Sequence, residues 1–256
     1  MTIAKLVLGI VSKPLEAQGY MCTETGNGAV KFHNPDNDSD ISFYRGRYRN
    51  FIVDYSRAPE YRFRPHLFDP RYGLGLEDGL FGQFYYSLSE LESIIYQYLD
   101  ITICYAIPLL NRLPVPCPHV TMEMYASLSI NVESRAKRWA SENNMPLRFE
   151  AKTLETLQNS IDQIRNGDYA KEHFEDALER ILDLAASLGE IVIGYKKHCQ
   201  WGWIVSDNLP EGYYISCNCE YFDPVMAIKN WWIYGPELSE YSFLVQCEKF
   251  FLRANI

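Results

Sequence analysis

The sequence predicts an α+β protein in which an antiparallel meander covered by helices precedes a mainly helical domain with a small β-hairpin sheet. Three observations support this fold class. Short runs of β-branched and aromatic residues follow one another between residues 29 and 64, apolar residues recur at helical spacing in several segments, and three prolines alternate between residues 114 and 118. Because successive prolines cannot continue a helix and stiffen the chain, we expect an N-terminal domain over residues 1–116 and a C-terminal domain over 117–256.

The N-terminal domain is expected to open with a helix over residues 3–18, which Pro14 kinks or splits and Gly19 closes. Strands of the meander are predicted at 29–33, 41–45, 50–55 and 61–64. Ser87-Leu-Ser-Glu90 is a capping box for a long amphipathic helix that runs towards Leu110. This helix should cover the meander, because an antiparallel sheet buries one of its faces.

The C-terminal domain is expected to begin with a strand over residues 120–130, where apolar and polar residues alternate. Asn131 can cap the helix that follows. Two further amphipathic helices are predicted, one ending at Gly167 and one capped by Asp168 and carrying Phe174. The last elements are a hairpin formed by residues 201–205 and 213–219, a helix that opens at Asp223-Pro224, and a helix that opens at Pro236.

Composition and charge exclude several classes of protein. The 256 residues are 47% apolar and 22% charged, as in a packed globular protein. The net charge of −9 disfavours nucleic acid and anionic membranes as partners, and residues 118–256 hold 13 basic against 20 acidic side chains. No apolar run reaches the roughly 18 residues of a membrane helix, and Lys5 and Lys13 stand where a signal peptide is apolar. We therefore expect a cytoplasmic protein that binds neither membrane nor nucleic acid.

Neither a metal nor a cofactor is predicted. His198-Cys199 and Cys217-x-Cys219 are the one group of zinc-ligand types, but neighbouring residues on a strand point to opposite faces. Seven scattered cysteines are typical of reduced thiols in a cytoplasm. The chain also lacks a Gly-x-Ser-x-Gly elbow and an HExxH helix, so the sequence leaves any catalytic residue unknown.

Seven of the arginines lie between residues 45 and 71. On an unbroken strand Arg45, Arg47 and Arg49 would share one face and form a ladder of planar donors suited to carboxylate or phosphate. Alternatively, Gly46 is a hairpin turn and the arginines pair with carboxylates of the chain itself. We favour the second interpretation, because an acidic protein offers many internal partners for arginine.

His66 is the one histidine in an unusual setting, between Arg64 and Asp69 and close to Arg62. If the protein is an enzyme, these residues are the candidates for a hydrolase-like site in a crevice between the two domains. The glycine-rich loop 73–82 would then act as a lid.

Four tryptophans, at positions 201, 203, 231 and 232, gather in the second domain. Trp201, Trp203, Trp231 and Trp232 are candidates for a protein-binding surface, since tryptophan is favoured at binding hot spots. In a small domain with few other large residues, however, tryptophans are more often core anchors.

Two segments resemble known groups of proteins. The first, over residues 1–113, carries a helix, Gly19-Tyr20, a meander with Phe32, Phe43-Tyr44 and Phe51-Ile-Val53, and a capped helix. This layout resembles small uncharacterised bacterial α+β domains, some of which look like immunity proteins encoded beside toxins. The second, over residues 150–235, carries Leu188-Gly-Glu190, Trp201-x-Trp203 and Pro224 through Lys229. It resembles another uncharacterised bacterial domain, and neither resemblance brings catalytic residues.

The sequence thus favours a non-enzymatic binding protein of the immunity or antitoxin type. Its acidic second half would attract a basic protein partner, and its tryptophans would supply affinity. The alternative is a small-molecule enzyme with the site around His66.

Overall fold

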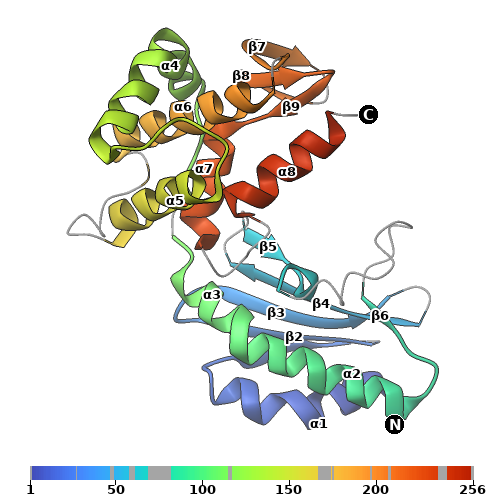
Figure 1. The fold of residues 1–256 in the computed structure, drawn as a ribbon. Coiled ribbons are helices and arrows are strands. Elements are labelled where there is room, and N and C mark those ends of the chain that lie inside the picture. Colours follow the sequence, from blue (N-terminus) through green and yellow to red (C-terminus); the bar gives the residue numbers. More distant parts are fainter. Residues whose placement is uncertain are drawn as a thin grey trace. The chain divides into compact units, whose positions relative to one another are not determined.

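The computed structural model is described over residues 2–26, 28–46, 49–57, 61–68, 82–114, 117–166, 174, 176–196, 198–206, 209–235 and 241–254. The predicted α+β fold class is confirmed. The chain divides into two compact units, Met1–Cys117 and Pro118–Ile256, each with its own helices and its own antiparallel sheet (Figure 1). The boundary expected from the prolines lies between residues 116 and 117.

The sheet of the first unit is an antiparallel meander in the order β1-β2-β3-β4-β5, with β6 paired to β4. The strands are β1 (Met21–Thr25), β2 (Ala29–Asn34), β3 (Ser39–Arg45), β4 (Asn50–Arg57), β5 (Tyr61–Phe63) and β6 (Gln83–Phe84). The four predicted strands correspond to β2 through β5. β1 was not predicted, because all its residues are exposed and show no apolar alternation, and β6 was not predicted because it has two residues.

Helices cover one face of this meander, as predicted (Figure 1). They are α1 (Ile3–Glu16), α2 (Leu88–Ile101) and α3 (Ile107–Arg112), with a π-helical turn at Thr102–Ala106 between the last two. Tyr98 of α2 lies over the sheet with its ring 6.1 Å from that of Phe51. The hydroxyls of Tyr55 and Thr102, both buried, are 2.8 Å apart. The long helix therefore buries the aromatic face of β4.

The helical stretch Leu88–Arg112 is, within the described chain, long and apolar enough to cross a membrane. Its most apolar window is 56% buried inside the protein. A core helix of a soluble protein meets the same criterion, so this stretch does not by itself indicate a membrane.

The second unit surrounds a central helix, α6 (Leu178–Tyr195), whose residues between Ile181 and Val192 are almost all buried. The other helices are α4 (Met122–Asn143), α5 (Ala151–Asn166), α7 (Pro224–Tyr234) and α8 (Phe243–Arg253). α6 begins later than predicted: Phe174 is buried in a turn before it, and the expected cap Asp168 lies outside the described residues. The predicted opening of the last helix at Pro236 also lies outside them.

The strand predicted over residues 120–130 is wrong, because this segment belongs to helix α4. α4 buries Met124, Tyr125 and Leu128, which lie on one helical face, whereas Ile130 is 75% exposed. The helical part of this segment, residues 122–130, is rich in helix-forming Met, Glu, Ala and Leu and has one β-branched residue, Ile130. The apolar residues at even positions therefore do not form one buried face: Met124 and Leu128 are buried, whereas Met122 and Ile130 are exposed.

Asn131 marks a kink within α4, with φ −136° and ψ 28°. The helical segment predicted to begin at Asn131 is thus present, but it continues a helix that Thr121 already caps. The Thr121 hydroxyl accepts a hydrogen bond from the Met124 amide at 3.4 Å.

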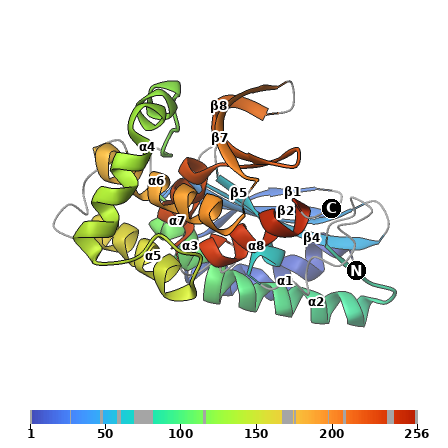
Figure 2. The ribbon, with the colours of Figure 1, turned by 45° about the horizontal axis from the view of Figure 1, so that its top comes forward.

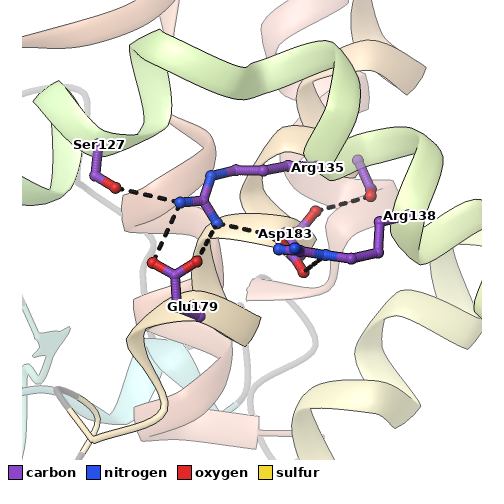
Figure 3. Close-up of polar contacts among 6 residues, drawn as sticks. Ser127, Arg135, Arg138, Glu179 and Asp183 are labelled. Atoms are coloured by element: carbon purple, nitrogen blue, oxygen red, sulfur yellow. Dashed lines mark hydrogen bonds and ion pairs between the residues drawn. The ribbon is translucent and has the colours of Figure 1, made fainter.

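An ion-pair cluster joins α4 to α6 (Figure 3). Arg135 is buried and donates to Glu179 Oε2 at 2.9 Å and to Asp183 Oδ1 at 3.0 Å. Arg138 also pairs with Asp183, because its Nε donates to the second carboxylate oxygen, Oδ2, at 2.8 Å. Although burial disfavours a charged guanidinium, the two carboxylates raise the pKa of Arg135. Two arginines of α4 are therefore fixed by carboxylates one helical turn apart on α6.

The second sheet has the order β7-β8-β9, formed by β7 (Gln200–Ser206), β8 (Leu209–Cys217) and β9 (Glu220–Phe222). The predicted hairpin is confirmed as β7 and β8, in which Trp203 lies opposite Tyr213. Figure 2 shows this hairpin extending from the helices of its unit. β9 was not predicted, because its three residues follow β8 after a two-residue turn.

Candidate functional site

The second unit contains a cleft of about 720 Å³, which is within the usual range for ligand sites. The segment before α4, the start of α4, strands β8 and β9, and the start of α7 line it. Its walls include the tyrosines Tyr125, Tyr214 and Tyr221 and the thioethers of Met122 and Met226. Its titratable groups besides the tyrosines are His119, Glu211, Asp223 and Lys229.

Asp223 is the polar centre of this cleft. Its Oδ1 accepts the Met226 amide at 3.0 Å and thereby caps α7, and its Oδ2 accepts the Tyr125 hydroxyl at 2.5 Å. Burial raises the pKa of Asp223 to about 6, against the opposing effect of these hydrogen bonds. Burial and the neighbouring Asp223 also raise the pKa of Tyr125, so this phenol remains protonated.

Two tyrosines form the aromatic wall beside Asp223. The rings of Tyr125 and Tyr214 are 5.6 Å apart, and the Tyr214 hydroxyl donates to the Pro210 carbonyl at 2.7 Å. A Cβ at Gly212 would lie 2.8 Å from the Tyr214 ring. Gly212 precedes Tyr214 by two residues on β8, and its lack of a side chain leaves room for this ring.

The cleft was not predicted from the sequence. Its central contact joins Tyr125 to Asp223, which are 98 residues apart in the chain. The available signal was Asp223-Pro224, which predicted the start of α7 but not a second hydrogen bond to the same carboxylate. Tyr125 was assigned to a strand, so its direction could not be inferred.

The arginine ladder, the less favoured of the two interpretations, does not have the unbroken strand that it requires. β3 ends at Arg45 and β4 begins at Asn50, and the Gly46 amide donates to the Asn50 carbonyl at 2.8 Å. Arg45 and Arg49 are exposed at this hairpin end, and Arg49 has a positive φ of 56°. Arg47 lies outside the described residues. Gly46 therefore lies in the connection of the β3–β4 hairpin, as the hairpin-turn interpretation predicted.

Arg64 has an internal carboxylate partner. Its Nε lies 2.5 Å from Asp54 Oδ1, and the other oxygen of Asp54 accepts the Tyr44 hydroxyl at 2.7 Å. Burial and the adjacent Asp54 raise the pKa of Tyr44 to about 12. Arg62 is exposed on β5.

His66 lies in a one-turn 3-10 helix (Pro65–Leu67) beside a hollow of about 310 Å³. Arg62, Phe63 and Arg64 also line this hollow. Asp69 and most of the predicted lid, residues 73–81, lie outside the described residues. The role of His66 in a hydrolase-like site stays a prediction.

The four predicted tryptophans divide into two pairs. Trp231 and Trp232 are each 5% exposed in the core of the second unit, which leaves little of either indole for a partner to contact. Trp201 is partly buried, and its Nε1 donates to Glu190 Oε1 at 2.9 Å. Trp203 is 43% exposed. The hairpin pair is therefore the one that reaches the surface.

The β7–β8 hairpin carries a continuous aromatic face, which we define as Trp201, Trp203 and Tyr213. The Tyr213 ring is parallel to Trp201 at 5.2 Å and lies 5.6 Å from Trp203. Trp201 rests on Gly189 of α6, where a Cβ would be 2.0 Å from the indole. The buried end of the face is thus fixed, and its Trp203 end is open to solvent.

No group of three or more metal-ligating side chains occurs within the part of the chain that the structure describes. Cys199 and Cys217 are buried at the base of the hairpin, and His198 is exposed. Burial and the neighbouring Cys217 raise the pKa of Cys199 to about 12, so this thiol stays protonated.

Comparisons with known proteins identify no relative: no family profile, no curated protein sequence and no solved structure matches the chain.

Proposed function

We propose that the chain is a cytoplasmic, non-enzymatic protein-binding module of the immunity or antitoxin type whose partner is a basic protein. The observation that supports this proposal best is the aromatic face of the β7–β8 hairpin, which is partly exposed in an acidic unit. The likeness of layout to bacterial immunity domains is consistent with it.

The aromatic face has the properties of a binding hot spot. Tryptophan and tyrosine provide large contact area and few rotatable bonds, so ordering them on binding costs little entropy. Trp203 packs on Tyr213, Tyr213 packs on Trp201, and the Trp201 indole is hydrogen bonded to Glu190. A partner that covers Trp203 meets a side chain that is already held in place.

The edge of the sheet supports the same proposal. Within the described chain β7 pairs with β8 alone, and Val205 near its end is 78% exposed. An edge strand with exposed apolar side chains is a template for pairing with a strand of another protein. Binding to this edge would satisfy free backbone groups while it covers Trp203 and Val205.

The negative charge of the second unit predicts the sign of the partner's charge. Residues 118–256 hold 20 acidic and 13 basic side chains, and Glu211 is exposed on β8. Complementary charge accelerates encounter and disfavours acidic competitors. The partner is therefore expected to be basic.

Co-expression with the products of neighbouring genes tests the proposal. We expect one such product to be toxic alone, to be neutralised by this chain, and to co-purify with it. Trp203→Ala should abolish neutralisation, whereas Tyr96→Ala, which removes an exposed aromatic side chain from α2 of the first unit, should not. Unchanged toxicity for every neighbouring product would refute the proposal.

A further inference from the structure

The cleft of the second unit holds a carboxylate that has neutral hydrogen-bond donors and no counter-ion. The Tyr125 hydroxyl and the Met226 amide each use one oxygen of Asp223. No Lys, Arg or His among the described residues lies within ion-pair distance of this carboxylate. A carboxylate has about four lone-pair sites, so Asp223 retains acceptor capacity for a ligand. Burial without a counter-ion disfavours the ionised form, and a cation in the cleft would offset this effect.

The surroundings of Asp223 suit an organic cation on an apolar stem. The rings of Tyr125 and Tyr214, whose centroids are 5.6 Å apart, both line the cleft and can attract a cation through their π electrons. Met122 and Met226 line the cleft with flexible thioethers that pack against alkyl chains. A hydrated inorganic ion would make no use of these apolar walls.

The other charged groups of the cleft do not neutralise Asp223. Lys229 follows it by six residues on α7, about 9 Å along the helix axis. Glu211 from β8 adds a second carboxylate, and His119 precedes α4. Besides His119, the lining carries the two carboxylates of Asp223 and Glu211 and the single ammonium group of Lys229.

We propose that this cleft binds the guanidinium or alkylammonium end of a basic side chain, with Asp223 as its counter-ion and Tyr125 and Tyr214 as its aromatic wall. The inference rests on the proposed function for the source of the cation, which is an arginine or lysine of the basic partner. The chemistry of the cleft itself does not depend on that source.

Calorimetric titration of the full chain with blocked amino acids tests this inference. At about pH 8, where the carboxylate is ionised, we expect saturable one-to-one binding of N-acetyl-arginine amide or N-acetyl-lysine amide. The uncharged N-acetyl-norleucine amide has a similar stem and should not bind. Equal binding of the norleucine compound, or no saturable binding of either cation, would overturn the inference.

Matched variants assign the binding to the cleft. Asp223→Asn keeps a side chain that caps helices well, and it should weaken cation binding about tenfold or more. Glu248→Gln removes one exposed carboxylate from α8 and should leave the affinity unchanged. Unfolding curves of both variants establish that each is folded. Equal affinities of the two variants would contradict the role of Asp223.

The same variants separate this inference from the proposed function. If the partner is bound through this cleft, Asp223→Asn weakens the complex and N-acetyl-arginine amide competes with it. If the blocked amino acid binds through Asp223 but the complex is insensitive to both, the partner is not the source of the cation. If no partner exists and the blocked amino acid still binds, the proposed function fails and the cation site stands.

Discussion

Asp223 combines a structural and a chemical role in one side chain. One oxygen caps α7 and the other accepts the Tyr125 hydroxyl, so the carboxylate is fixed by two elements that are far apart in sequence. A serine would cap the helix without a charge. The charge of this half-buried side chain is therefore the property of Asp223 that capping does not explain.

The titration of Asp223 predicts a pH dependence of stability. Burial raises its pKa from 3.8 to about 6, so between these values the folded protein holds a proton that the unfolded chain has lost. The contribution of this group to stability is therefore greatest below 3.8 and declines as the pH rises to about 6. We expect the free energy of unfolding of the wild type, minus that of Asp223→Asn, to fall from about pH 4 to about pH 7. Urea unfolding of both proteins across this pH range measures the difference. A difference that stays constant or rises with pH would contradict a raised pKa of Asp223.

Gly189 and Gly194 of α6 make a matched pair of substitutions. A Cβ at Gly189 would lie 2.0 Å from Trp201, whereas at Gly194 it would make an ordinary contact of 3.8 Å with the Leu147 carbonyl. Gly194→Ala should raise the free energy of unfolding by up to about 1 kcal/mol through helix propensity. Gly189→Ala should lower it by about 1–3 kcal/mol through overpacking, and tryptophan fluorescence should report the displaced indole. Equal effects in urea unfolding would show that Trp201 is not held against α6.

The ion pairs of Arg135 and Lys137 differ in burial. The Arg135 side chain is 8% exposed, and its loss leaves Asp183 with Arg138 and leaves Glu179 in solvent. Arg135→Ala should therefore destabilise the fold by about 3 kcal/mol, mainly through lost packing and hydrogen bonds. Lys137→Ala breaks an exposed pair with Glu133 and should change stability by less than about 0.5 kcal/mol. Chemical denaturation compares the two variants. A loss of stability below about 1 kcal/mol for Arg135→Ala would show that the ion pairs of Arg135 do not stabilise the packing of α4 on α6.

Among the elements, α4 shows why periodicity alone misassigns a segment. Apolar residues at even positions from 120 to 130 satisfy a strand pattern, while Met124, Tyr125 and Leu128 also satisfy a helical one. Both patterns are present, and local periodicity does not say which residues the core receives. The Thr121 cap favours the helix, as does the scarcity of β-branched residues between 122 and 130, where Ile130 is the single one.

Capped elements were predictable because their signals are local. The Ser87–Glu90 box forms both of its hydrogen bonds at the start of α2, and Asp223 caps α7 next to Pro224. Strand β1 has no such signal: it is exposed throughout and is defined by pairing with β2. The cleft is likewise defined by contacts between distant elements, which no local pattern contains.

The capping box of α2 provides a test at the scale of one element. The Ser87 hydroxyl accepts the Glu90 amide at 3.1 Å, and the Glu90 carboxylate accepts the Ser87 amide at 3.3 Å. Ser87→Ala should lower the free energy of unfolding by about 1 kcal/mol. Ser89→Ala, in the exposed first turn of the same helix, serves as the control and should be close to neutral. If thermal and urea unfolding give the same stability for both variants, the box does not contribute to α2.

At the scale of the whole molecule, the acidic excess and the partly exposed indoles of the β7–β8 hairpin belong to the same unit, the second. The first unit carries 11 basic and 13 acidic residues through Cys117, against 13 and 20 in the second. The positions of the tryptophans and of the acidic excess follow directly from the sequence. The sequence did not predict that the hairpin indoles reach the surface while Trp231 and Trp232 are core residues, because this depends on how α7 packs against α6.

The central claim is that the aromatic face binds a basic protein, and the affinity of the full chain for the partner isolated by co-expression tests it most directly. Calorimetry on the wild type, Trp203→Ala and Tyr96→Ala should show a loss of about tenfold or more for Trp203→Ala alone, with its unfolding curve unchanged. The wild-type affinity should also fall as salt is added. Equal affinities for the two variants would contradict the claim.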